Sequence, residues 1–318
     1  MRYAVAVLLC AIVALPACGD DDGGGGGEAG GPDRVRVQDT AGVPSAFLAY
    51  GVDQGFFEKR GLDVEVTPSQ GGATVVPAVV AGDTDIAGSN LVSVLLAQGK
   101  DIPVTIVAPG TFVRNQRSQD FSAILAAGDS DIRSPADLEG KTLAVNTLKN
   151  VAELAAKASL AKQGVDVSKI ELAEVDFPDM NGALTQGRVD AAFQIEPFVS
   201  LAVKEGHRII DRPYVGTKPG LQIGCYFTSE RYLSENEDVV ERFQQGVADT
   251  AAAIADDPGG FRAFLPEAAE IPPPAAEQAI LPAWKAENDQ ASLELTAELM
   301  ERYGVVEEKP DTSDAVVE

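Results

Sequence analysis

Gly82-Asp83-Thr84-Asp85-Ile86-Ala87 recurs in the second half of the chain as Gly187-Arg188-Val189-Asp190-Ala191-Ala192. In each copy a glycine ends a predicted helix, an aspartate follows three residues later, and a short apolar strand begins. Chance could produce such a phrase once, but two copies favour a duplicated architecture. The sequence therefore predicts two halves that are built alike.

Around these phrases, short β-branched runs alternate with helical patterns, which is typical of parallel βαβ units. In the first half we expect strands at 35–37, 62–66, 84–88 and 103–108, and helices at 45–59, 73–81 and 90–98. In the second half we expect strands at 122–127, 142–146, 170–175 and 191–195, and helices at 151–162, 181–186 and 197–204. A last strand at 223–228 precedes helices at 239–255 and 293–303, which we expect to cover the first half.

The predicted fold is therefore α/β, with two doubly wound lobes joined by two crossover segments and a ligand cleft between them. The crossovers are expected near 111–120 and 214–224, so that residues 34–120 plus 225–318 form lobe I and residues 121–224 form lobe II. The acidic tail after Glu307 is expected to fray.

The first residues have the pattern of an export signal. Arg2 supplies a positive charge, an apolar run at 3–14 is too short to span a bilayer, and Leu15-Pro16-Ala17-Cys18 resembles the bacterial lipobox. We expect a signal peptide at 1–17, lipidation of Cys18, and a flexible Gly/Asp tether at 18–33. The alternative is an ordinary secretory signal with an accidental cysteine. The predicted location is the cell envelope, either anchored by lipid to the outer face of the cytoplasmic membrane or in the periplasm.

Composition limits the possible partners and chemistry. The formal net charge of -24 would repel nucleic acid and anionic lipid surfaces, so we expect membrane contact through the lipid anchor only. Three cysteines, one of them in the segment expected to be removed, cannot build a disulfide framework. A single histidine, His207, and the absence of a Cys/His cluster or a G-x-S-x-G motif predict no metal, no cofactor and no catalysis.

The predicted ligand contacts lie at the strand-to-helix junctions. In open α/β sheets, ligands bind beyond the carboxyl ends of the strands, where helix N-termini present free N–H groups. Each junction could instead be an ordinary helix cap, but several in parallel across two lobes favour a shared ligand. The candidates with small, amide or hydroxyl groups are Thr40, Ser45, Ala46, Gln70, Gly72, Thr74, Ser89, Asn90, Asn146, Thr147 and Asn150.

Two carboxylates complete the predicted site. Glu196 follows the strand at 191–195 and precedes Pro197, so it could accept a hydrogen bond from the ligand, although capping alone could explain it. Asp176 lies at the junction after the strand at 170–175. Five aromatic residues could line the site of a heterocyclic solute, or could lie in the hydrophobic core instead. They are Phe47, Tyr50, Phe112, Phe193 and Tyr226.

Three segments resemble one protein family. Residues 43–64 closely match its helix-G-F-F-x-x-x-G-L-D/E-V opening. Residues 138–145 resemble its D-L-x-G-K-x-I-x-V entry, and residues 191–198 resemble its D-A-x-x-x-x-E-P segment. The family comprises binding proteins of importers for nitrate, sulfonate, taurine and thiamine-pyrimidine precursors, and the resemblance covers about residues 34–227. It implies the type II periplasmic binding protein fold, a monomer, and an ABC permease with its ATPase as partners.

Function stays open at two points. The hydroxyl and amide donors suit an oxyanion such as a sulfonate or nitrate. The carboxylates Asp176, Asp179 and Glu196 and the acidic body instead suit a solute with N–H or cationic groups. A ligand-sensing lipoprotein would use the same cleft, so the sequence does not separate sensing from import. A pyrimidine-forming enzyme on this scaffold would need an active-site histidine, and the position of His207 in a turn argues against it.

Overall fold

The computed structural model describes residues 31–269 and 271–317 of the chain. The predicted signal peptide at 1–17, the lipidation of Cys18 and the tether as far as residue 30 lie outside the described residues. Across the described ranges, no helix has the length and apolar character needed to cross a bilayer.

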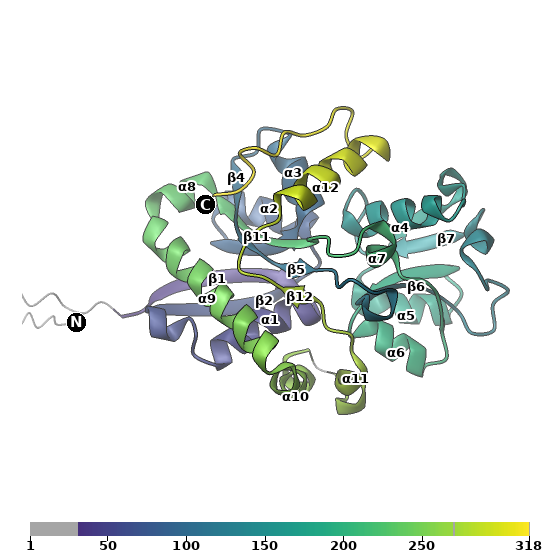
Figure 1. The fold of residues 1–318 in the computed structure, drawn as a ribbon, viewed down its shortest axis with the longest axis horizontal. Coiled ribbons are helices and arrows are strands. Elements are labelled where there is room, and N and C mark those ends of the chain that lie inside the picture. The colour runs from purple at the N-terminus through teal and green to yellow at the C-terminus, as the bar shows by residue number, and fades with distance from the viewer. Residues whose placement is uncertain (1–30, 270, 318) are drawn as a thin grey trace, which may run out of the picture. The chain divides into compact units, whose positions relative to one another are not determined.

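The first lobe is built on a five-stranded sheet of order β2-β1-β3-β11-β4 (Figure 1). Its strands are β1 (Asp33–Thr40), β2 (Leu62–Ser69), β3 (Ile86–Asn90), β4 (Val104–Pro109) and β11 (Gly224–Ser229). The strand β1 is parallel to β2 and β3, as expected of βαβ units. In contrast, β11 is antiparallel to both β3 and β4, because the chain enters it on returning from the second lobe.

Helices α1 (Val43–Asp53), α2 (Gly72–Ala81) and α3 (Leu91–Gln98) connect these strands. The helix predicted at 45–59 is shorter in the structure, because a turn with Gly55 at φ 69° separates α1 from the 3-10 turn Glu58–Arg60. Helices α8 (Glu230–Glu235), α9 (Glu237–Asp256) and α10 (Pro258–Ala268) follow β11. Helix α9 packs on α1 and β4, and its Phe243 ring stacks on Phe57 in the core.

The second lobe is built on a sheet of order β10-β6-β9-β7-β8. Its strands are β6 (Ser122–Ala126), β7 (Thr142–Val145), β8 (Glu171–Glu174), β9 (Ala191–Ile195) and β10 (Arg208–Asp211). Its helices are α4 (Val151–Lys162), α5 (Phe177–Thr185), α6 (Phe198–Lys204) and α7 (Pro213–Thr217). The first strand after the crossing, β6, is antiparallel to β9 and β10, whereas β7 is parallel to β8 and β9.

The crossing segments between the lobes pair with each other. Strand β5 (Thr111–Phe112) is antiparallel to β12 (Ala283–Trp284), which the sequence did not predict. On the other side of β5, the Ile223 N–H donates to the Thr111 carbonyl at 2.8 Å and the Val113 N–H donates to the Leu221 carbonyl at 2.8 Å. The segment that contains β12 thus joins the two predicted crossovers in one hydrogen-bonded group.

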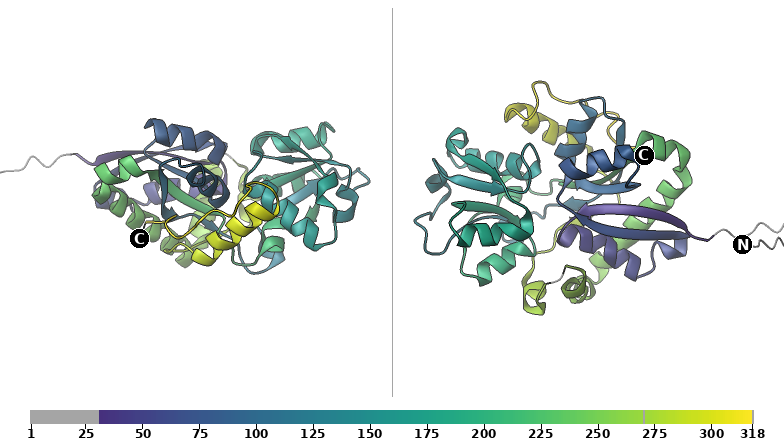
Figure 2. Two further views of the ribbon diagram at one scale, coloured as in Figure 1. Left: turned by 90° about the horizontal axis from the view of Figure 1, so that it is seen from above. Right: turned by 180° about the vertical axis from the view of Figure 1, so that it is seen from behind.

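The C-terminal part of the chain contacts both lobes. Helix α11 (Pro273–Gln278) packs on α6, and α12 (Gln290–Arg302), yellow in Figures 1 and 2, packs on α3 and α4. The last helices do cover the first lobe, as predicted, and α12 contacts the second lobe as well. The expected fraying of the tail was wrong: Ala315 is buried, and the Ile106 N–H of β4 donates to its carbonyl at 3.1 Å.

Candidate functional site

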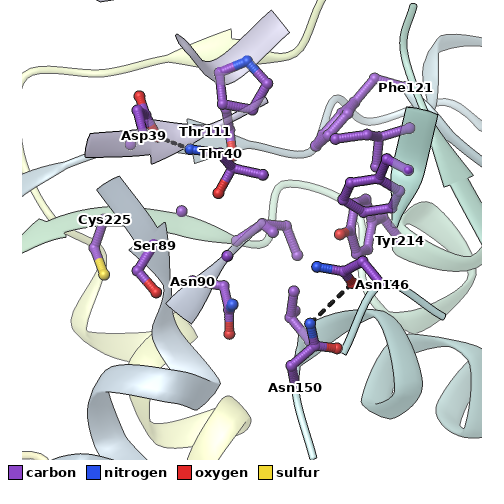
Figure 3. A pocket seen from close by; sticks show the side chains of 18 of the residues that line it. Asp39, Thr40, Ser89, Asn90, Thr111, Phe121, Asn146, Asn150, Tyr214 and Cys225 are labelled. Atoms are coloured by element: carbon purple, nitrogen blue, oxygen red, sulfur yellow. Dashed lines mark hydrogen bonds between the residues drawn. The ribbon is translucent and has the colours of Figure 1, made fainter. Parts of the chain in front are cut away.

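A cavity lies between the two lobes, beside the crossing segments. Figure 3 shows residues of β1, β3 and the start of α4 that line it. The polar residues that line it are Asp39, Thr40, Ser89, Asn90, Thr111, Asn146 and Asn150. Of the predicted contacts, the structure brings Thr40, Ser89, Asn90, Asn146 and Asn150 together at this cavity.

Asp39 supplies the one carboxylate among the residues that line the cavity. It is not among the ligand contacts predicted from the sequence. Strand β1 alternates, so that Val35, Val37 and Asp39 all point to the buried side. The Asp39 Oδ1 atom accepts from the Thr40 N–H at 2.7 Å, and Oδ2 accepts from the Tyr226 hydroxyl at 3.0 Å. Burial raises the pKa of Asp39 to about 7, although both hydrogen bonds act to lower it. A carboxylate on the apolar face of a strand end was the signal that could have identified it.

Ser89 and Asn90 end the neighbouring strand β3. The Asn90 Oδ1 atom accepts from the Ser93 N–H at 3.0 Å, so this side chain caps α3 while it also lines the cavity. The Ser89 hydroxyl is buried and has no hydrogen-bond partner within the part of the chain that the structure describes. An unpaired buried hydroxyl is costly unless another molecule satisfies it.

Asn146 connects the two lobes at the cavity. Its Nδ2 atom donates to the Gln70 carbonyl of the first lobe at 3.1 Å, and its Oδ1 atom accepts from Asn150 Nδ2 at 2.9 Å. Asn150 in turn caps α4 by accepting from the Ala152 N–H at 3.0 Å. Thr147 accepts from Asn150 at 2.6 Å but does not line the cavity. This amide network fixes the second-lobe wall of the site.

The structure places the other predicted residues outside the lining of this cavity: Ser45, Ala46, Gln70, Gly72, Thr74, Thr147, Asp176 and Glu196. The Ser45 and Thr74 hydroxyls donate to the carbonyls of Gly42 and Gly71 at the starts of α1 and α2. Ala46 belongs to the core of the first lobe. Gly72 packs against Ser93, which leaves no room for a side chain there. Contact between these residues and a ligand stays a prediction.

Gln70 and Asp176 make a second contact between the lobes. The Gln70 Nε2 atom donates to Asp176 Oδ2; Gln70 is exposed and Asp176 is half-buried. Both residues border a separate open pocket that also includes Thr74, Thr147 and Arg188. The two side chains therefore lie at the edge of the interface between the lobes.

Glu196 is 1% exposed and its carboxylate has three protein donors. Oε1 accepts from the Ser200 hydroxyl at 3.0 Å and from the Ile280 N–H at 3.2 Å, and Oε2 accepts from the Ser200 N–H at 3.0 Å. Burial is the main cause that raises the pKa of Glu196. The carboxylate thus caps α6 and ties it to the segment before β12, while its neighbour Ile195 lines the cavity.

The substitution Glu196→Ala is expected to lower the free energy of unfolding by about 2 kcal/mol, because it leaves buried N–H groups without an acceptor. Urea denaturation measures this change. Glu205→Ala, at the exposed end of the same helix, is the control and should change stability by less than about 0.5 kcal/mol. Equal effects of the two substitutions would show that the Glu196 contacts contribute nothing.

Aromatic rings form the apolar walls of the cavity. Phe121, Phe177, Tyr214 and Tyr226 line it, and the Phe121 and Tyr214 ring centroids are 5.1 Å apart. Of the five aromatic residues considered from sequence, Tyr226 lines the cavity; Phe47 instead stacks on Trp284 in the core, with centroids 5.0 Å apart. Among the lining residues Asp39 is the carboxylate, and none is Lys, Arg or His. The cavity therefore combines aromatic walls, neutral polar groups and one acidic side chain.

Comparisons with known proteins agree with this architecture. Residues 44–260 match the family model described as NMT1/THI5 like. The chain is 27% identical over 200 residues to the formylaminopyrimidine-binding protein of Halalkalibacterium halodurans, an alignment that covers 62% of this chain and 58% of that protein. It is 21% identical over 206 residues to the taurine-binding periplasmic protein of Escherichia coli K12, covering 65% and 62%. The chain thus spans less than two thirds of the length of these curated relatives.

Solved structures show the same fold. The alkanesulfonate-binding protein from Xanthomonas axonopodis pv. citri, bound to MOPS, superposes with a TM-score of 0.77 at 20% identity, covering 91% of this chain and 99% of that one. A Candida albicans protein described as having the generic periplasmic binding protein fold superposes with a TM-score of 0.69 at 14% identity, covering 89% and 92%. The predicted type II periplasmic binding protein fold is thereby confirmed.

Proposed function

Because the chain belongs to the NMT1/THI5-like family, we propose that it is the extracytoplasmic solute-binding component of an ABC importer. It captures a small organic solute or an oxyanion between its lobes and delivers it to a permease. The observation that carries this proposal is the cavity lined by polar side chains from both lobes, beside the segments that join them. The names of the relatives, which bind a formylaminopyrimidine and taurine, support the same role.

The proposed mechanism is closure of the lobes about the crossing segments. In the conformation described here the cavity measures about 50 Å³, whereas ligand pockets commonly measure about 300–1,000 Å³. A solute therefore enters when the lobes separate and is enclosed when they close. The contacts of Gln70 with Asn146 and Asp176 are few and polar, so they can break and reform during this motion.

Closure predicts a smaller radius of gyration when solute is present. Small-angle scattering of the protein with and without a solute that stabilises it measures this change. A solute at 100 times its dissociation constant should add about 2.7 kcal/mol to the free energy of unfolding, so thermal shifts identify the solute first. An unchanged radius of gyration at saturation would contradict closure, and the absence of any stabilising solute would contradict solute capture.

The partners follow from this role. An ABC permease and its ATPase receive the solute, and a lipid on Cys18 holds the monomeric binding protein at the cell envelope. We propose no catalytic activity, and two observations support this. The relatives named above are binding proteins, and the ring of His207 lies beside the Thr185 hydroxyl at 3.1 Å, outside the lining of the cavity.

A further inference from the structure

The acidic side chain of the cavity narrows the class of solute. Resting on the proposed function, we infer that the solute places a cationic or N–H-donating nitrogen group against Asp39, and that a simple oxyanion is the wrong class. The inference depends on a buried carboxylate of β1 that lines the cavity (Figure 3), where no lining residue is Lys, Arg or His.

Asp39 has capacity to accept further hydrogen bonds. Each of its oxygens has one donor, the Thr40 N–H on Oδ1 and the Tyr226 hydroxyl on Oδ2. An ionised carboxylate offers about four acceptor positions, so positions remain for a ligand. Asp39 is 3% exposed and forms no ion pair with any residue in the described ranges. A buried carboxylate without a counter-charge favours a partner that supplies one.

The close packing around Asp39 keeps its carboxylate in place. A Cβ atom on Gly88 would lie 1.9 Å from Asp39 Oδ1, so the carboxylate occupies the space directly over this glycine of β3. Ser89, the next residue along β3, points to the opposite face of the sheet, where its hydroxyl lies beside Gly72. A nitrogen group with two or more hydrogens can donate to the acceptor positions that remain on Asp39.

An oxyanion meets unfavourable groups at the same place. Ionised Asp39 repels it, and no lining residue is Lys, Arg or His. The side-chain oxygens of Asn90 and Asn150 already accept hydrogen bonds from N–H groups at the starts of α3 and α4. The Val43 N–H at the start of α1 donates to the Glu196 carbonyl. At the starts of these three helices, some N–H groups are therefore already paired and are not free to bind an anion.

The two solute classes predict opposite pH dependences. A cation needs ionised Asp39, so its binding releases a proton and weakens as the pH falls from 8 to 5. An anion needs the neutral carboxyl group, so its binding takes up a proton and strengthens over the same range. The pKa of Asp39, raised to about 7 by burial, places this change in an accessible range.

The test is a thermal-shift and calorimetric screen of the protein at pH 8 against aminopyrimidines, alkylamines, taurine, methanesulfonate and nitrate. We expect stabilisation by compounds with N–H groups, at least a tenfold loss of their affinity in Asp39→Asn, and weaker binding at pH 5. Asp63→Asn, the same change at an exposed position of β2, is the matched control and should bind as the unmodified protein does. Tyr226→Phe, which removes one donor to Asp39, provides a second variant should Asp39→Asn fail to fold, and it should also change the affinity for amines.

The outcomes separate the inference from the proposed function. Tight binding of methanesulfonate or nitrate that is unchanged or improved in Asp39→Asn, or that strengthens at pH 5, would overturn the inference and leave solute capture standing. Stabilisation by no compound of either class would overturn the proposed function and the inference with it.

Discussion

The substitution Gly110→Ala is expected to lower the free energy of unfolding by about 2 to 3 kcal/mol. Gly110 precedes β5, and its N–H donates to the Gly224 carbonyl at 3.0 Å where two crossing segments meet. A Cβ atom at this position would lie 2.7 Å from the Gly224 carbonyl carbon and 2.8 Å from the Cys225 nitrogen. These are backbone atoms held in a hydrogen-bonded group, so they cannot move aside without breaking its pairing.

Urea denaturation of the variant and of a matched control measures this effect. Gly182→Ala is the control, because Gly182 lies inside α5 and an added Cβ there meets no atom within 4 Å. Alanine is the better helix former, so Gly182→Ala should stabilise the protein by up to about 1 kcal/mol. Equal stabilities for the two variants would contradict the close approach of the crossing segments.

The second large effect concerns pH. The pKa of Asp39 is raised by burial from its ordinary value of 3.8 to about 7. Below pH 4 the group is protonated in both the folded and the unfolded protein. Between pH 4 and pH 7 the folded protein keeps a proton that the unfolded protein releases, so this group makes stability fall as the pH rises. Above pH 7 the contribution becomes constant.

At about 1.36 kcal/mol for each unit of pKa shift, the loss amounts to about 4 kcal/mol at most. The measurement is the free energy of unfolding of the unmodified protein and of Asp39→Asn, in urea, at several pH values from 4 to 8. The free energy of unfolding of Asp39→Asn, relative to that of the unmodified protein, should increase as the pH rises from 4 to 7. Glu196 and the acidic surface are present in both, so their contributions cancel. A difference that does not vary with pH would contradict a buried, uncompensated Asp39.

Much of the fold follows from local patterns in the sequence. Helices α2 and α4 and strands β6, β7 and β9 lie within two residues of their predicted bounds, because hydrophobic periodicity and terminal glycines are properties of short segments. The same applies to part of the site. Asn90 and Asn150 are recognisable as polar residues at strand-to-helix junctions, and in the structure each caps a helix and lines the cavity.

Other features depend on partners distant in the chain. Asp39 accepts from the hydroxyl of Tyr226, 187 residues away, and the Glu196 carboxylate accepts from the Ile280 N–H, 84 residues away. The antiparallel direction of β11, the pairing of β12 with β5 and the burial of Ala315 likewise result from packing between remote segments. The sequence by itself determined the α/β elements and the junctions where polar side chains gather. Only the tertiary structure decided which carboxylate faces the cavity, because burial and hydrogen-bond partners are set when the two lobes and the C-terminal segment pack together.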